Sequence, residues 1–289
     1  MNVPATPSPT GRGIASMILG MALLTTNDSI LKWLTTSYPV GQVLFMRGIF
    51  VFVPVAFFVW RAGGLDSLRI RNYRGQAARA AMAGGSSYVF VIGLSLLPIA
   101  DAIAISFAGP LFITALATPL LGERVGWRRW VAVMIGFAGV LVMIRPIGDM
   151  VRMAALLPLS AACIGAFRDI VTRGISRTDT SVSILTVSTV AVTLSGLFSL
   201  PHGWRTPVPM DIGLLALAGL LLGSAHFFMI EAYRQAEAAV VAPFKYTSMI
   251  WALLAGFLVW GDIPDGWTFA GSALVIASGL YILHRKTRR

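Results

Sequence analysis

The chain has 289 residues, of which 56% are hydrophobic and 12% charged, and its mean hydropathy is +0.78. This composition provides too few polar side chains to cover a water-soluble particle of that size, so it predicts a membrane protein. The formal net charge of +11 would also suit nucleic acid, and the positions of the charges must decide between the two. One cysteine excludes an intramolecular disulfide framework and any multi-cysteine metal site.

Ten apolar runs, each about long enough to cross a bilayer, follow one another along the sequence. Short polar or Pro/Gly breaks separate them, and the briefest is "LLPIAD" at 96–101. The runs lie at about 14–36, 41–60, 76–97, 100–121, 128–145, 153–173, 181–200, 211–233, 238–260 and 267–283. We therefore predict an all-α integral membrane protein with ten transmembrane helices and the lipid bilayer as its surroundings.

Lys and Arg residues are distributed unevenly between the two sides of such a chain. If the N-terminus is inside, most of the 23 basic residues lie in cytoplasmic loops or ends, and the opposite side receives Arg145, Arg152 and Arg205. Cytoplasmic loops of membrane proteins carry this excess. We expect both termini in the cytoplasm, and the topology explains the basicity without nucleic acid as a partner.

The two halves of the chain resemble each other. The segment "ISFAGPLFITALATPLLGERVGW" at 105–127 parallels "FKYTSMIWALLAGFLVWGDIPDGW" at 244–267, and "NDSILK" at 27–32 parallels "RDIVTR" at 168–173. Each half holds five runs, an odd number, so the second half enters the membrane in the opposite orientation. We predict one membrane domain of two inverted five-helix repeats, residues 1–145 and 146–289, as in many secondary transporters.

The fourth run ends at Gly122-Glu123-Arg124, and this ending recurs as "WGD" at the end of the ninth. With the ten runs and the five-plus-five repeat, it resembles the drug/metabolite transporter superfamily, specifically its EamA-type branch, from about Ile14 to Leu283. The resemblance implies a multi-pass carrier of the inner (plasma) membrane that works by alternating access. Its nearest likeness there is to exporters of aromatic amino acids.

Outward transport of amino acids, aromatic ones in particular, is the function we expect from this resemblance. A carrier of drugs or other metabolites in the same superfamily is the alternative. A polytopic membrane enzyme is a less favoured class, because the sequence has no His-Glu-x-x-His, no Gly-x-Ser-x-Gly and only three His. It also lacks a Gly-x4-Gly-Lys-Ser/Thr loop for ATP. We expect no enzymatic activity, cofactor or metal; monomer and dimer both stay open.

Lys245 lies inside the ninth apolar run, with no acidic residue closer than Glu237. A charged group in hydrocarbon costs about 2.5–3.5 kcal/mol, so it usually faces a cavity or a partner. Helical rise places Lys245 and His226 at one depth on adjoining helices, where they would suit a substrate carboxylate. Alternatively, Lys245 snorkels to the cytoplasmic interface or pairs with Glu231 or Glu237. For His226 the alternative is a buried histidine satisfied by a neighbouring helix.

Three aromatic residues lie around this depth: Tyr88, Tyr246 and Trp251. Their rings pair favourably with other rings and carry a polar group, so we predict that they bind an aromatic substrate. Packing within the helix bundle is the alternative for each of them.

A separate polar group lies on the first predicted helix. Asn27 and Asp28 are candidates for the substrate site, and Asp28 is the carboxylate we expect to carry a proton if transport is proton-coupled. The i and i+4 spacing of Asp28 and Lys32 allows a second interpretation, in which the two neutralise one another. Arg47 on the second helix is a candidate partner for Asp28. Arg168 and Asp169, the equivalent positions in the second repeat, are predicted to form an interfacial pair.

Pro110 in the fourth run and Pro243 in the ninth interrupt helical hydrogen bonding. We expect kinks there that leave carbonyl groups free and act as hinges during transport. Small residues at 81–87, 136–139 and 271–280 predict instead that helices approach one another closely.

Overall fold

The computed structural model describes residues 9–121, 126–144, 153–175, 178–235 and 241–287. Every regular element within these ranges is a helix. Six of the helices are long and apolar enough to cross a membrane, and shorter apolar helices occur at Trp130–Ile144, Phe244–Trp260 and Gly266–Ile282. The protein is therefore an all-α, multi-pass membrane protein. The predicted signature Gly122-Glu123-Arg124 lies outside the described residues.

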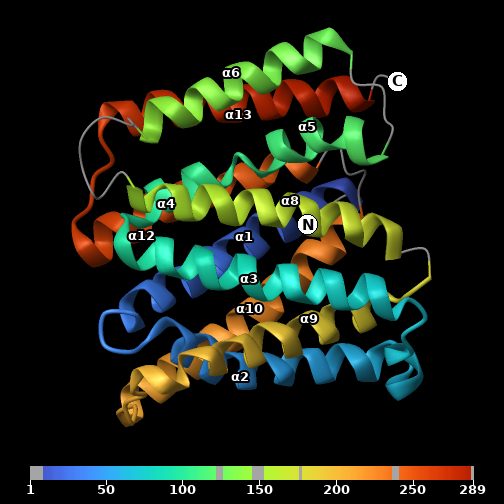
Figure 1. Ribbon diagram of the computed structural model, residues 1–289, viewed down its shortest axis with the longest axis vertical. Helices are drawn as coiled ribbons and strands as arrows, with labels where there is room; N and C mark the ends of the chain where they lie inside the picture. Colours follow the sequence, from blue (N-terminus) through green and yellow to red (C-terminus); the bar gives the residue numbers. More distant parts are fainter. Residues whose placement is uncertain (1–8, 122–125, 145–152, 176–177, 236–240, 288–289) are drawn as a thin grey trace, which may run out of the picture.

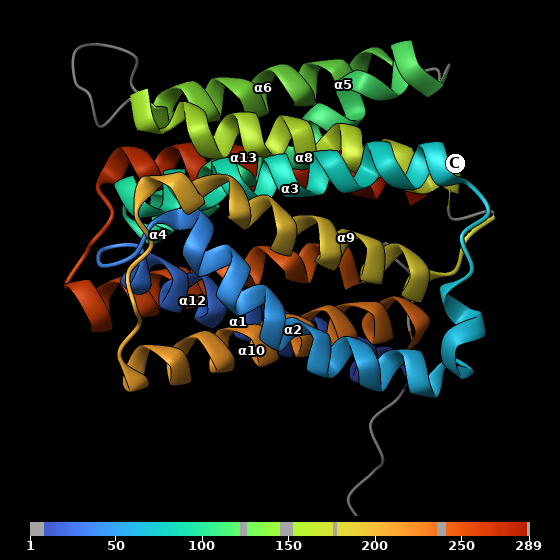
Figure 2. The same ribbon diagram turned by 60° about the horizontal axis from the view of Figure 1, so that its bottom comes forward.

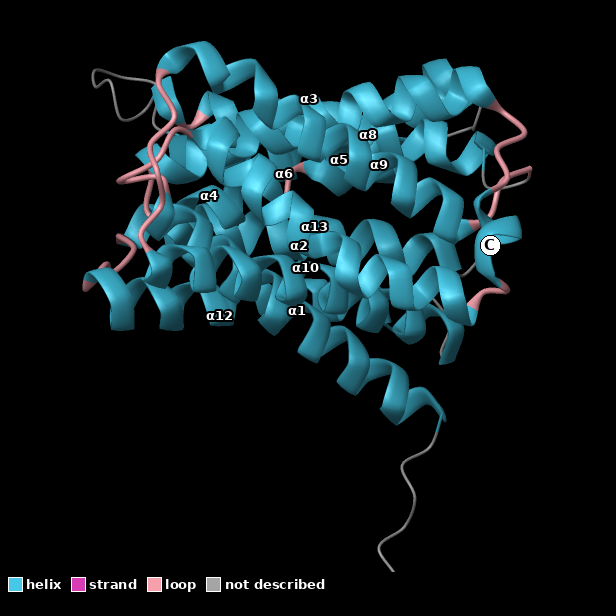
Figure 3. Cartoon of the chain, turned by 90° about the horizontal axis from the view of Figure 1, so that it is seen from below, coloured by secondary structure: helices cyan, strands magenta, loops and turns pink. Residues whose placement is uncertain are grey.

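The helices run between two ends of the bundle, where the described loops gather (Figure 3). The first half contains α1 (Pro9–Leu34), α2 (Val40–Arg61), the 3-10 helix η1 (Gly64–Leu68), α3 (Tyr73–Leu96), α4 (Ile99–Ser106), α5 (Gly109–Leu121) and α6 (Trp127–Ile144). The second half contains α8 (Leu156–Ile175), α9 (Ser181–Ser195), η2 (Gly196–His202), α10 (Pro209–Gln235), η3 (Ala242–Thr247), α12 (Ser248–Ala255), η4 (Gly256–Trp260) and α13 (Gly266–Thr287).

The predicted breaks in the chain occur where proline interrupts the helical hydrogen bonds. Helix α3 ends at Leu96 and α4 begins at Ile99 after Pro98. In the fourth apolar run, a turn at 107–108 separates α4 from α5, in which Pro110 is the second residue. The ninth run is divided into the 3-10 helix η3, which has Pro243 as its second residue, the α-helix α12 and the π-helix η4. Departures from α-helix occur at both predicted kinks, and such segments are frequent at functional sites.

Long-range packing follows a regular pattern. Helix α1 packs against α10, and α3 packs against α8. Figures 1 and 2 show α6 and α13 together on one side of the molecule and α2 with α10 on the other. Most of the deepest apolar side chains, such as Leu44, Leu94 and Leu111, lie in the core between these layers.

Helices α6 and α13 approach closely through glycines. A Cβ on Gly139 would lie 2.8 Å from the carbonyl oxygen of Gly271, and a Cβ on Gly271 would lie 2.5 Å from that of Gly139. These contacts confirm the close approach predicted for 136–139 and 271–280. In the stretch 81–87, a Cβ on Gly84 would lie 3.3 Å from Cβ of Ser195 on α9. A Cβ on Gly85 would meet no atom within 4 Å.

The carboxylate of Asp179 joins the start of α3 to the start of α9. This buried side chain accepts hydrogen bonds from the backbone N–H groups of Arg71 (3.0 Å) and Asn72 (3.2 Å) and from Nε2 of Gln76 (2.9 Å). Burial opposes ionisation of Asp179, but these hydrogen bonds outweigh it and hold the pKa of the carboxyl below its ordinary value.

We expect Asp179→Asn to lower the thermal midpoint of the purified protein by about 3–6 °C. A hydrogen bond to a charged group contributes about 1.5–3 kcal/mol, and a chain of this size loses about 2 °C per kcal/mol. Because the folded pKa lies below the unfolded value of about 3.9, this stabilisation is present above that value and is lost as the pH falls through the folded pKa. Thermal scans in detergent from pH 7 to pH 3 measure it. The exposed Asp66→Asn is the control, and equal acid sensitivity in wild type and Asp179→Asn would contradict the assignment.

Candidate functional site

Asn27, Asp28 and Arg47 form a polar cluster between α1 and α2, which we call the first cluster. Asn27 is fully buried and Arg47 is 5% exposed. Nδ2 of Asn27 donates to Oδ1 of Asp28 at 2.9 Å, and Nη1 of Arg47 donates to Oδ1 of Asn27 at 3.3 Å. The charges of Asp28 and Arg47 also act on each other. The structure thus brings together the predicted site residues Asn27 and Asp28 and links Arg47 to Asp28 through the amide of Asn27.

One N–H donor of the Arg47 guanidinium is not used within the described part of the chain. Its Nε is buried and has no hydrogen-bond partner in the described part of the chain. An unpaired buried donor is costly, and native proteins seldom contain one without a functional reason. This N–H can therefore serve a group that is not part of the chain.

Lys32 is held by α3 instead of by Asp28. Its Nζ donates to the carbonyl oxygens of Leu94 (3.3 Å) and Leu97 (2.5 Å), beside the C-terminus of that helix, where a cation is favoured. The ammonium also lies 5.4 Å from the centroid of the Trp260 ring, a cation–π distance. The interpretation of Asp28 and Lys32 as a mutually neutralising pair is therefore wrong.

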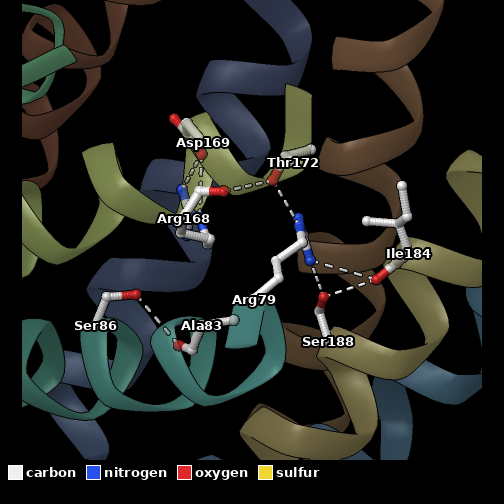
Figure 4. A network of polar contacts seen from close by, with 8 residues as sticks. All are labelled: Arg79, Ala83, Ser86, Arg168, Asp169, Thr172, Ile184 and Ser188. Carbon is white, nitrogen blue, oxygen red and sulfur yellow. Dashed lines mark hydrogen bonds and ion pairs between the residues drawn. The ribbon is translucent and has the colours of Figure 1, made fainter. Parts of the chain in front are cut away.

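Arg79 is the centre of another polar cluster, which joins α3, α8 and α9 (Figure 4). Its Nε donates to Oγ1 of Thr172 at 2.7 Å. Its Nη1 donates to the carbonyl oxygen of Ile184 at 3.4 Å and to Oγ of Ser188. One half-buried arginine of α3 is thus bonded to two other helices.

Arg168 and Asp169 on α8 complete this cluster. Nη2 and Nε of Arg168 lie 3.0 and 3.1 Å from Oδ1 of Asp169, which confirms the predicted pairing of these two residues. Both charges act on Arg79. We call this set the second cluster: Arg79, Arg168, Asp169, Thr172 and Ser188.

His226 lies on α10, partly buried. Its Nδ1 lies 3.0 Å from the carbonyl oxygen of Leu222 in the preceding turn. The charges of Arg47 in the first cluster and of Arg79 and Arg168 in the second act on its ring. The contact that the structure gives His226 is therefore within its own helix.

Lys245 and His226 differ in the exposure of their side chains. It is on η3 with its side chain exposed, whereas His226 is partly buried in α10. The predicted pairing of these two cations around one carboxylate stays a prediction.

The three predicted aromatic residues occupy different surroundings. The ring of Tyr246 meets Phe107 edge to face, with centroids 4.9 Å apart. Trp251 packs against the smaller core cluster, and Tyr88 packs against the larger one. The Tyr246 hydroxyl and the Trp251 Nε1 are buried without a hydrogen-bond partner among the described residues. Their role in binding substrate stays a prediction.

Sequence reasoning missed Arg79 because it counted this residue among the cytoplasmic loop charges. The signal was its context: "AARAAMAGG" at 77–85 continues an apolar, small-residue helix on both sides of the arginine. A cation within such a helix needs a partner.

A model of the EamA-like transporter family matches residues 11–145 and again residues 152–283. The chain belongs to the EamA-like transporter family. It is 32% identical to a riboflavin transporter of Rhizobium johnstonii over 98% of this chain and 94% of that protein. It is 26% identical to an S-adenosylmethionine uptake transporter of Rickettsia conorii, over 96% and 94%. One solved crystal structure has the same fold, with a TM-score of 0.67 and 19% identity over 95% of this chain and 99% of that one.

Family membership assigns the protein to the drug/metabolite transporter superfamily, as the sequence predicted. It is a membrane transporter of small metabolites.

Proposed function

We propose that the protein is a secondary transporter that moves a small aromatic metabolite by alternating access. The observation that supports this most is the pair of polar clusters, which place Asp28, Arg47 and Arg79 on three helices long and apolar enough to cross a membrane and bond the two arginines to other helices. Ionisable residues in such segments are costly and usually mark a substrate or ion pathway.

The moving parts we propose are two inverted repeats, residues 1–145 and 146–289. Equivalent helices have equivalent neighbours: α1 packs on α10 as α8 packs on α3, and α2 packs on α10 as α9 packs on α3. Phe107 and Tyr246, which are aligned by the repeat, contact each other, as residues near a pseudo-two-fold axis would. Pro110 and Pro243, at the helix irregularities, are the proposed hinges.

The topology we propose has ten spans, in the inner membrane, with both termini in the cytoplasm. In it, α4 with α5, α9 with η2, and η3 with α12 and η4 each make up one span. The last turn of α13 lies at the same end of the bundle as the basic α2–α3 connection (Figure 1), which supports this orientation.

Aromatic amino acids, moved outward, are the substrates we propose first. Arg47 in the first cluster and Arg79 and Arg168 in the second suit a carboxylate, and the predicted Tyr88, Tyr246 and Trp251 suit a ring. Riboflavin is the second candidate, because a protein 32% identical to this chain over 98% of its length is named a riboflavin transporter. Asp28, held in the first cluster, is the carboxylate we propose for proton exchange.

Counterflow in proteoliposomes tests the transport function. Vesicles preloaded with unlabelled phenylalanine, riboflavin or S-adenosylmethionine receive the labelled compound outside, and a carrier accelerates its influx. A channel or an enzyme gives no such acceleration. A pH gradient that drives accumulation in wild type but not in Asp28→Asn supports proton exchange at Asp28. Absence of counterflow for a broad panel of metabolites would contradict the proposed carrier.

We predict that Lys245→Ala lowers phenylalanine counterflow about tenfold or more, because the substrate carboxylate loses one of its cationic partners, which Lys245 supplies in addition to the arginines of the two clusters. Lys245→Arg should also impair transport, since a planar fork does not replace a compact ammonium at a fitted site. Rates at matched protein density, for phenylalanine and for phenethylamine, measure the effect. Wild-type rates in Lys245→Ala would identify a snorkelling lysine instead.

A further inference from the structure

We propose that Arg79 and Arg168 form an anion-binding station in the second cluster that takes the carboxylate or phosphate group of the transported substrate. The inference rests on the proposed transport function and extends it, since it assigns the charged end of the substrate to particular residues. The shared chemistry of the ligand is a compact oxyanion.

The charge of the second cluster is unbalanced. Among the described residues, the hydrogen bonds of Arg79 all go to neutral oxygens, those of Thr172, Ile184 and Ser188. Asp169, the carboxylate whose charge reaches Arg79, is already paired with Arg168 at 3.0 Å. Two guanidinium groups thus share one carboxylate, and the second of them, Arg79, belongs to the candidate span α3, where an unbalanced cation is costly. An oxyanion would balance this charge.

The guanidinium of Arg79 is held ready for a ligand. The hydroxyl of Thr172 donates to the Arg168 carbonyl and that of Ser188 to the Ile184 carbonyl, each at 2.7 Å, so both hydroxyl oxygens are left to accept from Arg79 (Figure 4). These bonds engage Nε and Nη1, and Nη2 has no partner in the described chain. A fixed guanidinium edge binds carboxylate and phosphate well because little flexibility is lost on binding.

Access to the station comes from the Arg168 side. The side chains of Arg168 and Asp169 are 32% and 50% exposed, whereas Arg47 in the first cluster is 5% exposed. The second cluster is therefore the more exposed of the two.

Comparison of the two repeats shows that the charge excess belongs to the second cluster. Asp28 and Asp169 are aligned, but the residue before the aspartate is Asn27 in one repeat and Arg168 in the other. Arg47 is the eighth residue of α2, and Ser188 is the eighth of α9. The first cluster therefore balances one arginine with one aspartate. In the second cluster, Arg79 belongs to the other repeat, bonds Ser188 and adds a positive charge.

The test is ligand binding to the purified protein in detergent, which does not depend on transport. Two probe pairs share a ring and differ in the oxyanion: phenylalanine with phenethylamine for the carboxylate, and riboflavin 5′-phosphate with riboflavin for the phosphate. Wild type should bind the oxyanion member of at least one pair about tenfold more tightly, as expected from one charged hydrogen bond. Arg79→Gln should abolish the preference, Arg168→Gln should reduce it, and Arg79→Lys should keep part of it.

The exposed Arg74→Gln on the same helix is the matched control and should leave the preference unchanged. If Arg79 has only a structural role, Arg79→Gln lowers the thermal midpoint but leaves the ratio of affinities within each probe pair as in wild type. An unchanged ratio would therefore overturn the station. No oxyanion preference in wild type for either pair would also overturn it. Counterflow that persists while the preference is absent rejects the station and keeps the carrier. A preference that depends on Arg79 in a protein without counterflow keeps the station and rejects the carrier.

Discussion

Arg47→Ala is expected to reduce counterflow at least tenfold and to destabilise the protein by about 3–5 kcal/mol, the loss found when one partner of a buried charge pair is removed. Arg47 is 5% exposed, and its charge acts on Asp28 while Nη1 bonds the Asn27 amide. The variant leaves the Asp28 carboxylate without a cation inside the membrane. Thermal midpoints in detergent and counterflow at matched protein density measure the two effects.

A double variant separates stability from transport at Arg47. Asp28→Asn combined with Arg47→Gln removes both charges, so we expect it to regain most of the lost stability without regaining transport. Arg61→Ala, at the exposed end of the same helix, is the matched control and should behave as wild type. An Arg47→Ala protein with a wild-type midpoint and wild-type counterflow would show that the first cluster is dispensable.

Gly271→Ala is expected to cost about 1–3 kcal/mol, the usual penalty for overpacking. The new Cβ would lie 2.5 Å from the Gly139 carbonyl oxygen and 2.4 Å from Cγ of Met143. The methionine side chain can move away, but the carbonyl belongs to the backbone of α6, so the two helices must separate. Since α6 and α13 pack along each other, their separation should also reduce counterflow.

Gly266→Ala on the same helix is the matched control, because a Cβ there would meet no atom within 4 Å. Gly266 is the first residue of α13 and Gly271 lies inside it, so the gain in helix propensity favours Gly271→Ala. A lower midpoint for Gly271→Ala therefore comes from the contact with α6. A Gly271→Ala midpoint equal to that of Gly266→Ala would show that α6 and α13 do not rely on this close approach.

The sequence by itself determined the membrane class, the helical segments and the breaks between them. Hydrocarbon requires every backbone group to be paired within its own helix, so long apolar runs interrupted by Pro98, Pro110 and Pro243 leave few other structures. The helix-approach glycines Gly139 and Gly271 were predictable as well, because close packing in membranes favours small residues.

Only the tertiary structure decided which polar groups meet. The i and i+4 spacing suggested Lys32 as the partner of Asp28, but Asp28 accepts from the Asn27 amide, which Arg47 of α2 bonds in turn, and Lys32 bonds the end of α3. Arg79 likewise finds its oxygens on α8 and α9. Spacing within one helix identifies neighbours on its own surface. It carries no information about which other helix packs against that surface, and long, flexible side chains such as lysine bind wherever their charge is best satisfied.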